Sequence, residues 1–104
     1  MIARIWRGAV RTEDADAYAR YVEHTGIEGY KKTPGNLGAW ALTRPVGDLT
    51  EIVTISFWES MRAVGAFAGE RVERAVFYPE DEHFLVERDL TVRHYEVGGE
   101  RAGL

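Results

Sequence analysis

One stretch, residues 51–60, constrains the fold of this 104-residue chain more than any other. Side chains of an extended strand alternate between two faces, and neither face carries a charge between Ile52 and Trp58. A strand without a solvent-exposed face is usually central in its sheet and covered on both sides. Ser60 then offers a hydroxyl that can cap a helix. The stretch therefore predicts a buried central strand that passes directly into a helix.

Three further strands are predicted from alternating side chains. They cover residues 2–10, 38–46 and 90–97, where β-branched, aromatic and other apolar residues recur with period 2. Residues 45–48 contain the breakers of a hairpin that leads into the central strand. Because Pro45 cannot donate to a β-ladder, its strand is predicted to lie at a sheet edge.

The first helix is predicted over residues 12–25. Thr12 is suited to cap it, acidic residues follow at the positive end of the helix dipole, and apolar residues recur at helical spacing. Gly26 is predicted to end this helix, because glycine is common just beyond a helix C-terminus. Residues 27–36 are then predicted to form a connecting loop with a turn at Pro34 and Gly35.

A second helix is predicted over residues 61–76, where apolar side chains recur every three to four positions. Gly65 and Gly69 each weaken it by about 1 kcal/mol relative to alanine, so a kink or break is expected near Gly69. Pro79 and the three carboxylates after it are typical of a first helical turn, which predicts a short third helix through Leu85.

The resulting order is βαββαβ, which predicts an α+β protein with a ferredoxin-like fold. Such a fold has a four-stranded antiparallel sheet with two main helices on one face. The other face still carries apolar side chains, so a second copy of the same sheet is expected to cover it. The chain is predicted to be one domain, residues 1–97, with a flexible tail over residues 98–104.

Charge and composition limit the classes of partner that are expected for this protein. The chain has 13 basic and 17 acidic residues, a formal net charge of −4, which disfavours nucleic acid. It has no apolar run long enough for a signal peptide or a membrane span, so no membrane partner and a cytoplasmic location are expected. Without cysteine, there is no disulfide, thiolate nucleophile or thiolate metal ligand.

Several motifs resemble those of the antibiotic biosynthesis monooxygenase-like family, of the dimeric α+β barrel superfamily. The resemblance spans residues 2–97 and lies in the Thr-Pro-Gly-Asn turn at 33–36, the strand-to-helix passage at 55–60, and the segments 77–81 and 94–97. It implies a homodimer whose two sheets close into a barrel, with a pocket between sheet and helices in each protomer. Members of this family oxidise polycyclic phenols without a cofactor, degrade haem, or isomerise and break down small molecules.

The haem-degrading branch of that family carries an asparagine on the first strand, a tryptophan inside the second helix and a histidine after it. Here the first strand reads Ile-Trp-Arg at residues 5–7, the helix position holds Phe67, and residues 72–78 contain no histidine. Haem breakdown is therefore disfavoured, and no cofactor is expected. The cofactor-free branch uses an asparagine and a tryptophan near the end of the third strand. Trp58 matches the tryptophan, while the strand offers no amide.

Candidate residues follow from what cofactor-free oxygenation requires: an anion stabiliser, a proton acceptor and a dry aromatic pocket. Arg7 or Arg4 is suited to stabilise an oxyanion, and His83 or His24 to transfer a proton. The sequence predicts Arg7 and His83 as catalytic groups. The pocket wall is predicted to contain Trp58, Tyr18, Tyr21 and Phe67.

Structural roles compete with each of these assignments. Trp58 can instead be a core or barrel-rim aromatic. Arg4 and Arg7 lie on opposite faces of one strand, so at most one faces the pocket, and either can form an ion pair across a dimer. His24, His83 and His94 lack the spacing of a helical ligand pair, so no metal site is predicted.

Two functions are therefore expected. The first is a cofactor-independent monooxygenase-like protein that acts on an aromatic or polyketide-like small molecule. The alternative is a non-catalytic dimeric module that binds a hydrophobic small molecule. Haem binding through His83 or His94 is the less favoured third possibility.

Overall fold

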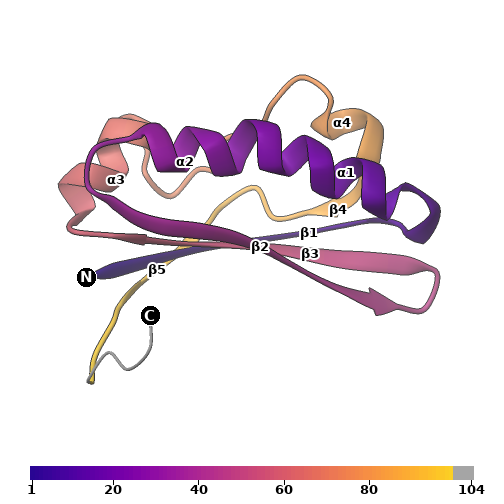
Figure 1. The fold of residues 1–104 in the computed structure, drawn as a ribbon, viewed down its shortest axis with the longest axis horizontal. Coiled ribbons are helices and arrows are strands. Elements are labelled where there is room, and N and C mark those ends of the chain that lie inside the picture. The colour runs from indigo at the N-terminus through magenta and orange to yellow at the C-terminus, as the bar shows by residue number, and fades with distance from the viewer. Residues whose placement is uncertain (100–104) are drawn as a thin grey trace.

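The computed structural model describes residues 1–99 and contains one antiparallel sheet with its helices on one side (Figure 1). The strands are β1 (Ile2–Arg11), β2 (Asn36–Val46), β3 (Leu49–Trp58), β4 (Leu85–Arg88) and β5 (Arg93–Glu96). The helices are η1 (Thr12–Asp14), α1 (Ala15–Val22), η2 (Glu23–Ile27), α2 (Glu28–Lys32), α3 (Met61–Ala68) and α4 (Asp81–Phe84). The strand order is β2-β3-β1-β4, with β5 also paired to β1, which confirms the predicted ferredoxin-like fold. The predicted tail, residues 98–104, lies outside the described residues except for Gly98 and Gly99.

Strand β3 is central, as its sequence predicts. It pairs with β1 along its whole length, from Leu49 to Trp58, and with β2 on its other side. Burial alternates along it, so that Ile52, Thr54, Ser56 and Trp58 face the helices and are almost fully enclosed. Ser60 caps α3 by accepting a hydrogen bond from the N–H of Ala63 at 3.2 Å. The predicted passage from buried strand to capped helix is therefore confirmed.

The first helical region runs further than predicted. It continues from α1 through the π-helical turn η2 into α2 and ends at Lys32, so the predicted stop at Gly26 and most of the predicted loop over residues 27–36 are wrong. A glycine ends a helix by adopting positive φ, and Gly26 does not do so. Gly29 in α2 lies close to its neighbours, since a Cβ there would stand 2.9 Å from the Tyr78 hydroxyl. Among residues 1–99, none of the helices has both the length and the apolar character needed to cross a membrane.

The second helix is shorter than predicted. Helix α3 ends at Ala68, and Gly69 follows it with φ of 82°, so the expected break occurs there and the predicted extension to residue 76 is wrong. Residues 69–80 then cross the sheet without helical structure. One isolated bridge, between Arg74 and Thr91, joins this segment to the chain before β5.

The fourth strand position is shared by two short strands. Strand β4 pairs with β1 at Gly8–Val10, and β5 pairs with β1 at Ile2–Ile5, on the same edge. The predicted strand over residues 90–97 is therefore confirmed only as β5, and β4 takes residues that the sequence assigned partly to the third helix. That third helix is present as α4.

The two faces of the sheet differ in cover. Helices and residues 69–80 bury one face, whereas no described segment packs on the other (Figure 1). On this open face, Trp40, Leu42 and Tyr95 are 47%, 53% and 50% exposed. Trp40 contacts Phe57 edge to face, with ring centroids 5.9 Å apart. The open face is therefore substantially apolar.

Candidate functional site

A small cavity lies between the helix-covered face of the sheet, the α1–η2 helix and residues 75–81. Its volume is about 40 Å³, which is room for a few water molecules. The sheet contributes Trp6 and Thr54, and the opposite wall contains tyrosines and one carboxylate. The complete lining is Trp6, Tyr18, Val22, Thr25, Gly26, Tyr30, Thr54, Ala75, Val76, Phe77, Tyr78, Asp81 and Val92.

The polar centre of this cavity is a buried pair, Tyr18 and Asp81. The Tyr18 hydroxyl donates to Asp81 Oδ1 at 3.0 Å, and Asp81 Oδ2 accepts from the main-chain N–H of Tyr78 at 2.6 Å. The two residues are 2% and 5% exposed. Burial first, and then the charge of Asp81, raises the pKa of Tyr18 well above its ordinary value. Tyr18 therefore remains a hydroxyl donor throughout the physiological pH range.

Two tyrosines of α1, spaced three residues apart, hold Asp81 in place. Tyr18 and Tyr21 lie on one face of the helix, and the Tyr21 hydroxyl accepts from the N–H of Glu80 at 2.9 Å. Phe84 packs against both rings, at centroid distances of 5.2 and 6.1 Å. The two tyrosines therefore attach residues 78–81 to α1 and fix the carboxylate at the cavity.

The remaining walls are aromatic. The indole of Trp6 donates to the carbonyl of Asp89 at 2.8 Å, and its ring meets Phe77 edge to face at 6.2 Å. Burial raises the pKa of the Tyr78 hydroxyl, with smaller contributions from Tyr30, Asp81 and Tyr21. The cavity thus combines apolar rings with hydroxyls that stay protonated.

Of the four side chains predicted to form the pocket wall, Tyr18 lines the cavity. Trp58 is fully buried, donates from its indole N–H to Ser56 Oγ at 2.9 Å, and packs among Tyr30 and Phe67 at 5.8 and 6.1 Å. Tyr30 stands between this aromatic cluster and the cavity. Tyr21 supports Tyr18 from the side. The structure thus brings Trp58 and Phe67 together, next to the cavity rather than on its wall.

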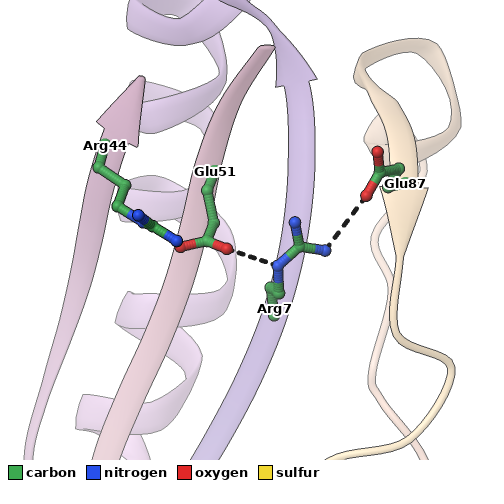
Figure 2. Close-up of polar contacts among 4 residues, drawn as sticks. All are labelled: Arg7, Arg44, Glu51 and Glu87. Atoms are coloured by element: carbon green, nitrogen blue, oxygen red, sulfur yellow. Dashed lines mark hydrogen bonds and ion pairs between the residues drawn. The ribbon is translucent and has the colours of Figure 1, made fainter. Parts of the chain in front are cut away.

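Arg7, predicted as a catalytic group, lies on the open face of the sheet. Its Nε donates to Glu51 Oε2 at 2.6 Å, and its Nη1 contacts Glu87 at 3.3 Å. Arg44 Nε donates to the second oxygen of Glu51 at 2.8 Å. Figure 2 shows these four side chains as a row across β2, β3, β1 and β4. We call them the ionic row.

The charges of the ionic row are mutually matched. Hydrogen bonds from Arg44 and then Arg7 hold the pKa of Glu51 below its ordinary value, and the Glu51 hydrogen bond raises the pKa of Arg7. The row lies on the opposite side of the sheet from the cavity, because Arg7 and Trp6 are adjacent in β1 and point to opposite faces. The catalytic role of Arg7 stays a prediction.

The histidines lie apart from the cavity. His83 is exposed in α4, two residues beyond Asp81, and His24 is exposed with Nδ1 3.8 Å from Glu28. His94 lies on β5 beside Arg4. Within residues 1–99, no three histidine, aspartate or glutamate side chains are grouped to hold a metal. A catalytic role for His83 likewise stays a prediction.

As shaped in this structure, the cavity does not accommodate haem. Pockets for ligands of drug size measure roughly 300–1,000 Å³, whereas this one is about 40 Å³. Its described lining residues include no histidine to bind iron.

Sequence reasoning missed Asp81, Tyr78 and Tyr30 as lining residues. In the sequence, Asp81 is one of three carboxylates at a predicted helix start. Only its position three residues after Tyr78 indicates a side chain that caps a turn. Tyr30 falls in the region predicted as a loop. Trp6 was predicted only as a strand residue, because alternation does not say which face meets the helices.

Comparisons with models of protein families and with curated proteins find no match. Among solved structures, the chain is similar to an antibiotic biosynthesis monooxygenase-like protein from Bacillus cereus, with 18% identity and a TM-score of 0.68 over 98% of this chain and 97% of that one. It is also similar to MhuD, a heme-degrader from Mycobacterium tuberculosis whose structure has two hemes bound in its active site. That match has 20% identity and a TM-score of 0.63 over 98% and 100% of the two chains. An antibiotic biosynthesis monooxygenase-like protein from Nitrosomonas europaea also matches, with 16% identity and a TM-score of 0.60 over 95% of this chain and 98% of that one. The resemblance seen in the sequence is thus confirmed for the fold: this chain is folded as the antibiotic biosynthesis monooxygenase-like proteins are.

Proposed function

We propose that this protein is a cofactor-independent monooxygenase-like enzyme that acts on an aromatic or polyketide-like small molecule in the cavity between sheet and helices. The observation that carries the proposal is the Tyr18–Asp81 pair, a carboxylate and a hydroxyl donor buried in an aromatic cavity. The fold supports it, because solved structures of the same fold are described as monooxygenase-like proteins and a heme degrader. The chemistry itself depends on the site.

The carboxylate of Asp81 is the proton acceptor in this proposal. It takes a proton from an acidic C–H of an anthrone-type substrate. The Tyr18 hydroxyl, which donates to Asp81 Oδ1 before this transfer, then turns to donate to the resulting anion. Dioxygen accepts electrons from the anion and forms a C–O bond, and the proton returns to give a hydroperoxide. The O–O bond then breaks with loss of water, leaving a carbonyl. One substrate and one dioxygen thus give one quinone and one water.

A polycyclic substrate needs more room than about 40 Å³. Residues 70–76 are the wall suited to move, because they lack helical structure and join the sheet region through one isolated bridge and a few hydrogen bonds. We therefore propose that the substrate enters by displacing this wall rather than the sheet.

Oxygen uptake with anthrone, measured with an electrode, tests the proposal. We expect uptake by the wild type to exceed the rate without protein, and Asp81→Asn to lower kcat/KM by about 10²–10⁴-fold, the usual contribution of a general base. Glu82→Gln, the same change at the exposed neighbouring residue, is the matched control and should stay within about twofold. Uptake that equals the protein-free rate would contradict enzymatic oxygenation.

Arg7 and His83 are tested in the same assay. Arg7→Gln and His83→Gln should leave kcat/KM within about twofold if proton transfer occurs at Asp81. A loss of more than about tenfold for either variant would instead support the catalytic roles predicted from the sequence.

One observation favours the second candidate, a binding module without turnover. Both oxygens of Asp81 already accept hydrogen bonds, which is the arrangement of a structural carboxylate as well as of a positioned base. Native mass spectrometry of freshly purified protein distinguishes the candidates. A retained small molecule that is released unchanged, together with no oxygen uptake, would favour binding alone.

We further propose that the protein is a homodimer joined through its open sheet faces. The exposed side chains Trp40, Leu42, Val46 and Tyr95 lie on this face, beside the half-buried Ile55 and Phe57. The ionic row contributes two positive and two negative charges that already neutralise one another. A second sheet could therefore cover the face without burying an unpaired charge of the row.

A further inference from the structure

Arg4 is a fully buried cation on the helix-covered face of β1. This residue is 1% exposed, although arginine is seldom enclosed to this degree. Its nitrogens donate to the main-chain carbonyls of Val72 at 2.6 Å and Arg74 at 3.2 Å. The guanidinium lies over the ring of Phe67, 5.9 Å from the centroid. An arginine keeps its charge in proteins, so a positive charge is enclosed here.

No described carboxylate pairs with this charge. The ion pairs found among residues 1–99 involve Arg7, Arg11, Arg44 and His24, and none involves Arg4. The Nε atom of Arg4 is buried without a hydrogen-bond partner. Buried charges are ordinarily paired with an opposite charge, because desolvation is costly. The hydrogen-bond acceptors around the guanidinium are thus all neutral, and its Nε–H donor has no acceptor.

His94, which also contacts Arg4, adds no negative charge. Its Nε2 lies 3.0 Å from Arg4 Nη1 and can accept from it only as a neutral imidazole. Burial, and then the charge of Arg4, lowers the pKa of His94, while Glu73 opposes this. The neighbour of Arg4 therefore supplies a lone pair and no charge.

The carbonyls that hold Arg4 lie in the segment whose next residues line the cavity. We call residues 70–76 the cover segment. It places Val72 and Arg74 over the guanidinium, and its next residues, Ala75 and Val76, line the cavity. On β1, Arg4 and Trp6 point to the same face two residues apart, and Trp6 lines the cavity. Displacement of the cover segment would therefore enlarge the cavity and free the guanidinium together.

We propose that Arg4 binds an acidic group, a carboxylate or an ionised hydroxyl, of the molecule that enters this cavity. The inference rests on the proposed function in one respect, that an aromatic molecule enters there. In this structure the guanidinium donates to the carbonyls of the cover segment. An anion that replaces them supplies the missing charge and an acceptor for Nε, and a guanidinium fork suits a carboxylate through two parallel hydrogen bonds.

Isothermal titration calorimetry with two probes tests the inference. The probes are 2-naphthoate and 2-naphthalenemethanol, which share a ring system and differ in charge. We expect the wild type to bind the carboxylate at least about tenfold more tightly, as charged hydrogen bonds do. Arg4→Met should remove that preference and leave the affinity for the alcohol within about twofold. Arg74→Met, which removes an exposed positive charge and keeps the Arg74 carbonyl, should retain the preference.

The outcomes separate this inference from the proposed function. Equal affinity of the wild type for both probes overturns the role of Arg4 and leaves the entry of aromatic molecules supported. An equal loss in Arg4→Met and Arg74→Met also overturns it, since general attraction would then explain the preference. If neither probe gives a heat of binding, the result contradicts the proposed function and, with it, the role of Arg4. If Arg4→Met fails to fold, Arg4→Lys takes its place, and retention of less than the full preference is expected because lysine lacks the fork.

Discussion

The Tyr18 hydroxyl has one described acceptor, a carboxylate that is itself buried, so its contribution to stability depends on pH. Its pKa is raised in the folded protein, and the folded state therefore holds this proton more tightly than the unfolded chain does. The stabilisation is fully present below about pH 10, where the unfolded tyrosine is also protonated. It is lost as the pH rises further, by up to about 1.4 kcal/mol per pH unit for one such group.

Tyr18→Phe should show both effects in urea unfolding. At pH 7 we expect the free energy of unfolding to fall by about 1–3 kcal/mol, because Asp81 loses a buried donor. Between about pH 10 and 11 the stability of the variant should decline less steeply than that of the wild type, because only the wild type has this tyrosine to titrate. Tyr21→Phe keeps the Tyr18–Asp81 hydrogen bond and should keep the wild-type slope. Parallel slopes for Tyr18→Phe and the wild type would contradict this role of Tyr18.

The site was only partly predictable from the sequence at this scale. Tyr18 was identified because it recurs at helical spacing in the first helix, and the family resemblance implies a pocket between sheet and helices. Alternation divides β1 into two sets without saying which faces the helices, so Arg7 was chosen over Arg4, and Trp6 was not placed in the pocket. Asp81 was not identified, because its roles toward Tyr78 and Tyr18 depend on a turn and on a helix 63 positions away.

At the scale of elements, two glycines with similar local sequence signals behave in opposite ways. Gly26 remains inside the helical region without positive φ, whereas Gly69 ends α3 at φ 82° and ψ −161°. Both were predicted as break points. Periodicity and capping residues were enough to predict the order of the elements. Where these two helices end depends on tertiary contacts. Helix α2 packs against β2, and a strand edge shared by β4 and β5 cannot be anticipated from alternation alone.

Alanine at each glycine should therefore change stability in opposite directions. At Gly26, a Cβ would meet Tyr78 Cε2 at an ordinary 3.9 Å, so Gly26→Ala should raise the free energy of unfolding by about 0.5–1 kcal/mol. At Gly69 there is open space, but the backbone conformation is one that only glycine adopts readily, so Gly69→Ala should lower it by about 1–3 kcal/mol. Urea unfolding of the pair measures both. A gain for Gly69→Ala would show that the turn after α3 adapts without strain.

At the scale of the whole molecule, the sheet separates two environments. One face carries the cavity, Arg4 and the packed aromatic cluster, and the other carries exposed apolar side chains around the ionic row (Figure 2). β1 carries Arg4 to one face and Arg7 to the other, three residues apart. Arg7 is paired with Glu51 and Glu87, and Arg4 has no ionic partner within residues 1–99. Two arginines of one strand thus differ in role: one is neutralised on the proposed dimer face, and the other is proposed to bind an anion.

The proposed dimer is tested by charging its apolar face. Leu42 is 53% exposed on the open face, and Leu42→Glu would place a carboxylate against the partner sheet. Sedimentation at micromolar concentration should give about twice 11.8 kDa for the wild type and 11.8 kDa for this variant. Leu90→Glu makes the same change at a residue that is 65% exposed between β4 and β5, outside the strands, and should remain dimeric. A wild type that sediments at 11.8 kDa would exclude the dimer at that concentration, and an open face of this composition would then require a different partner.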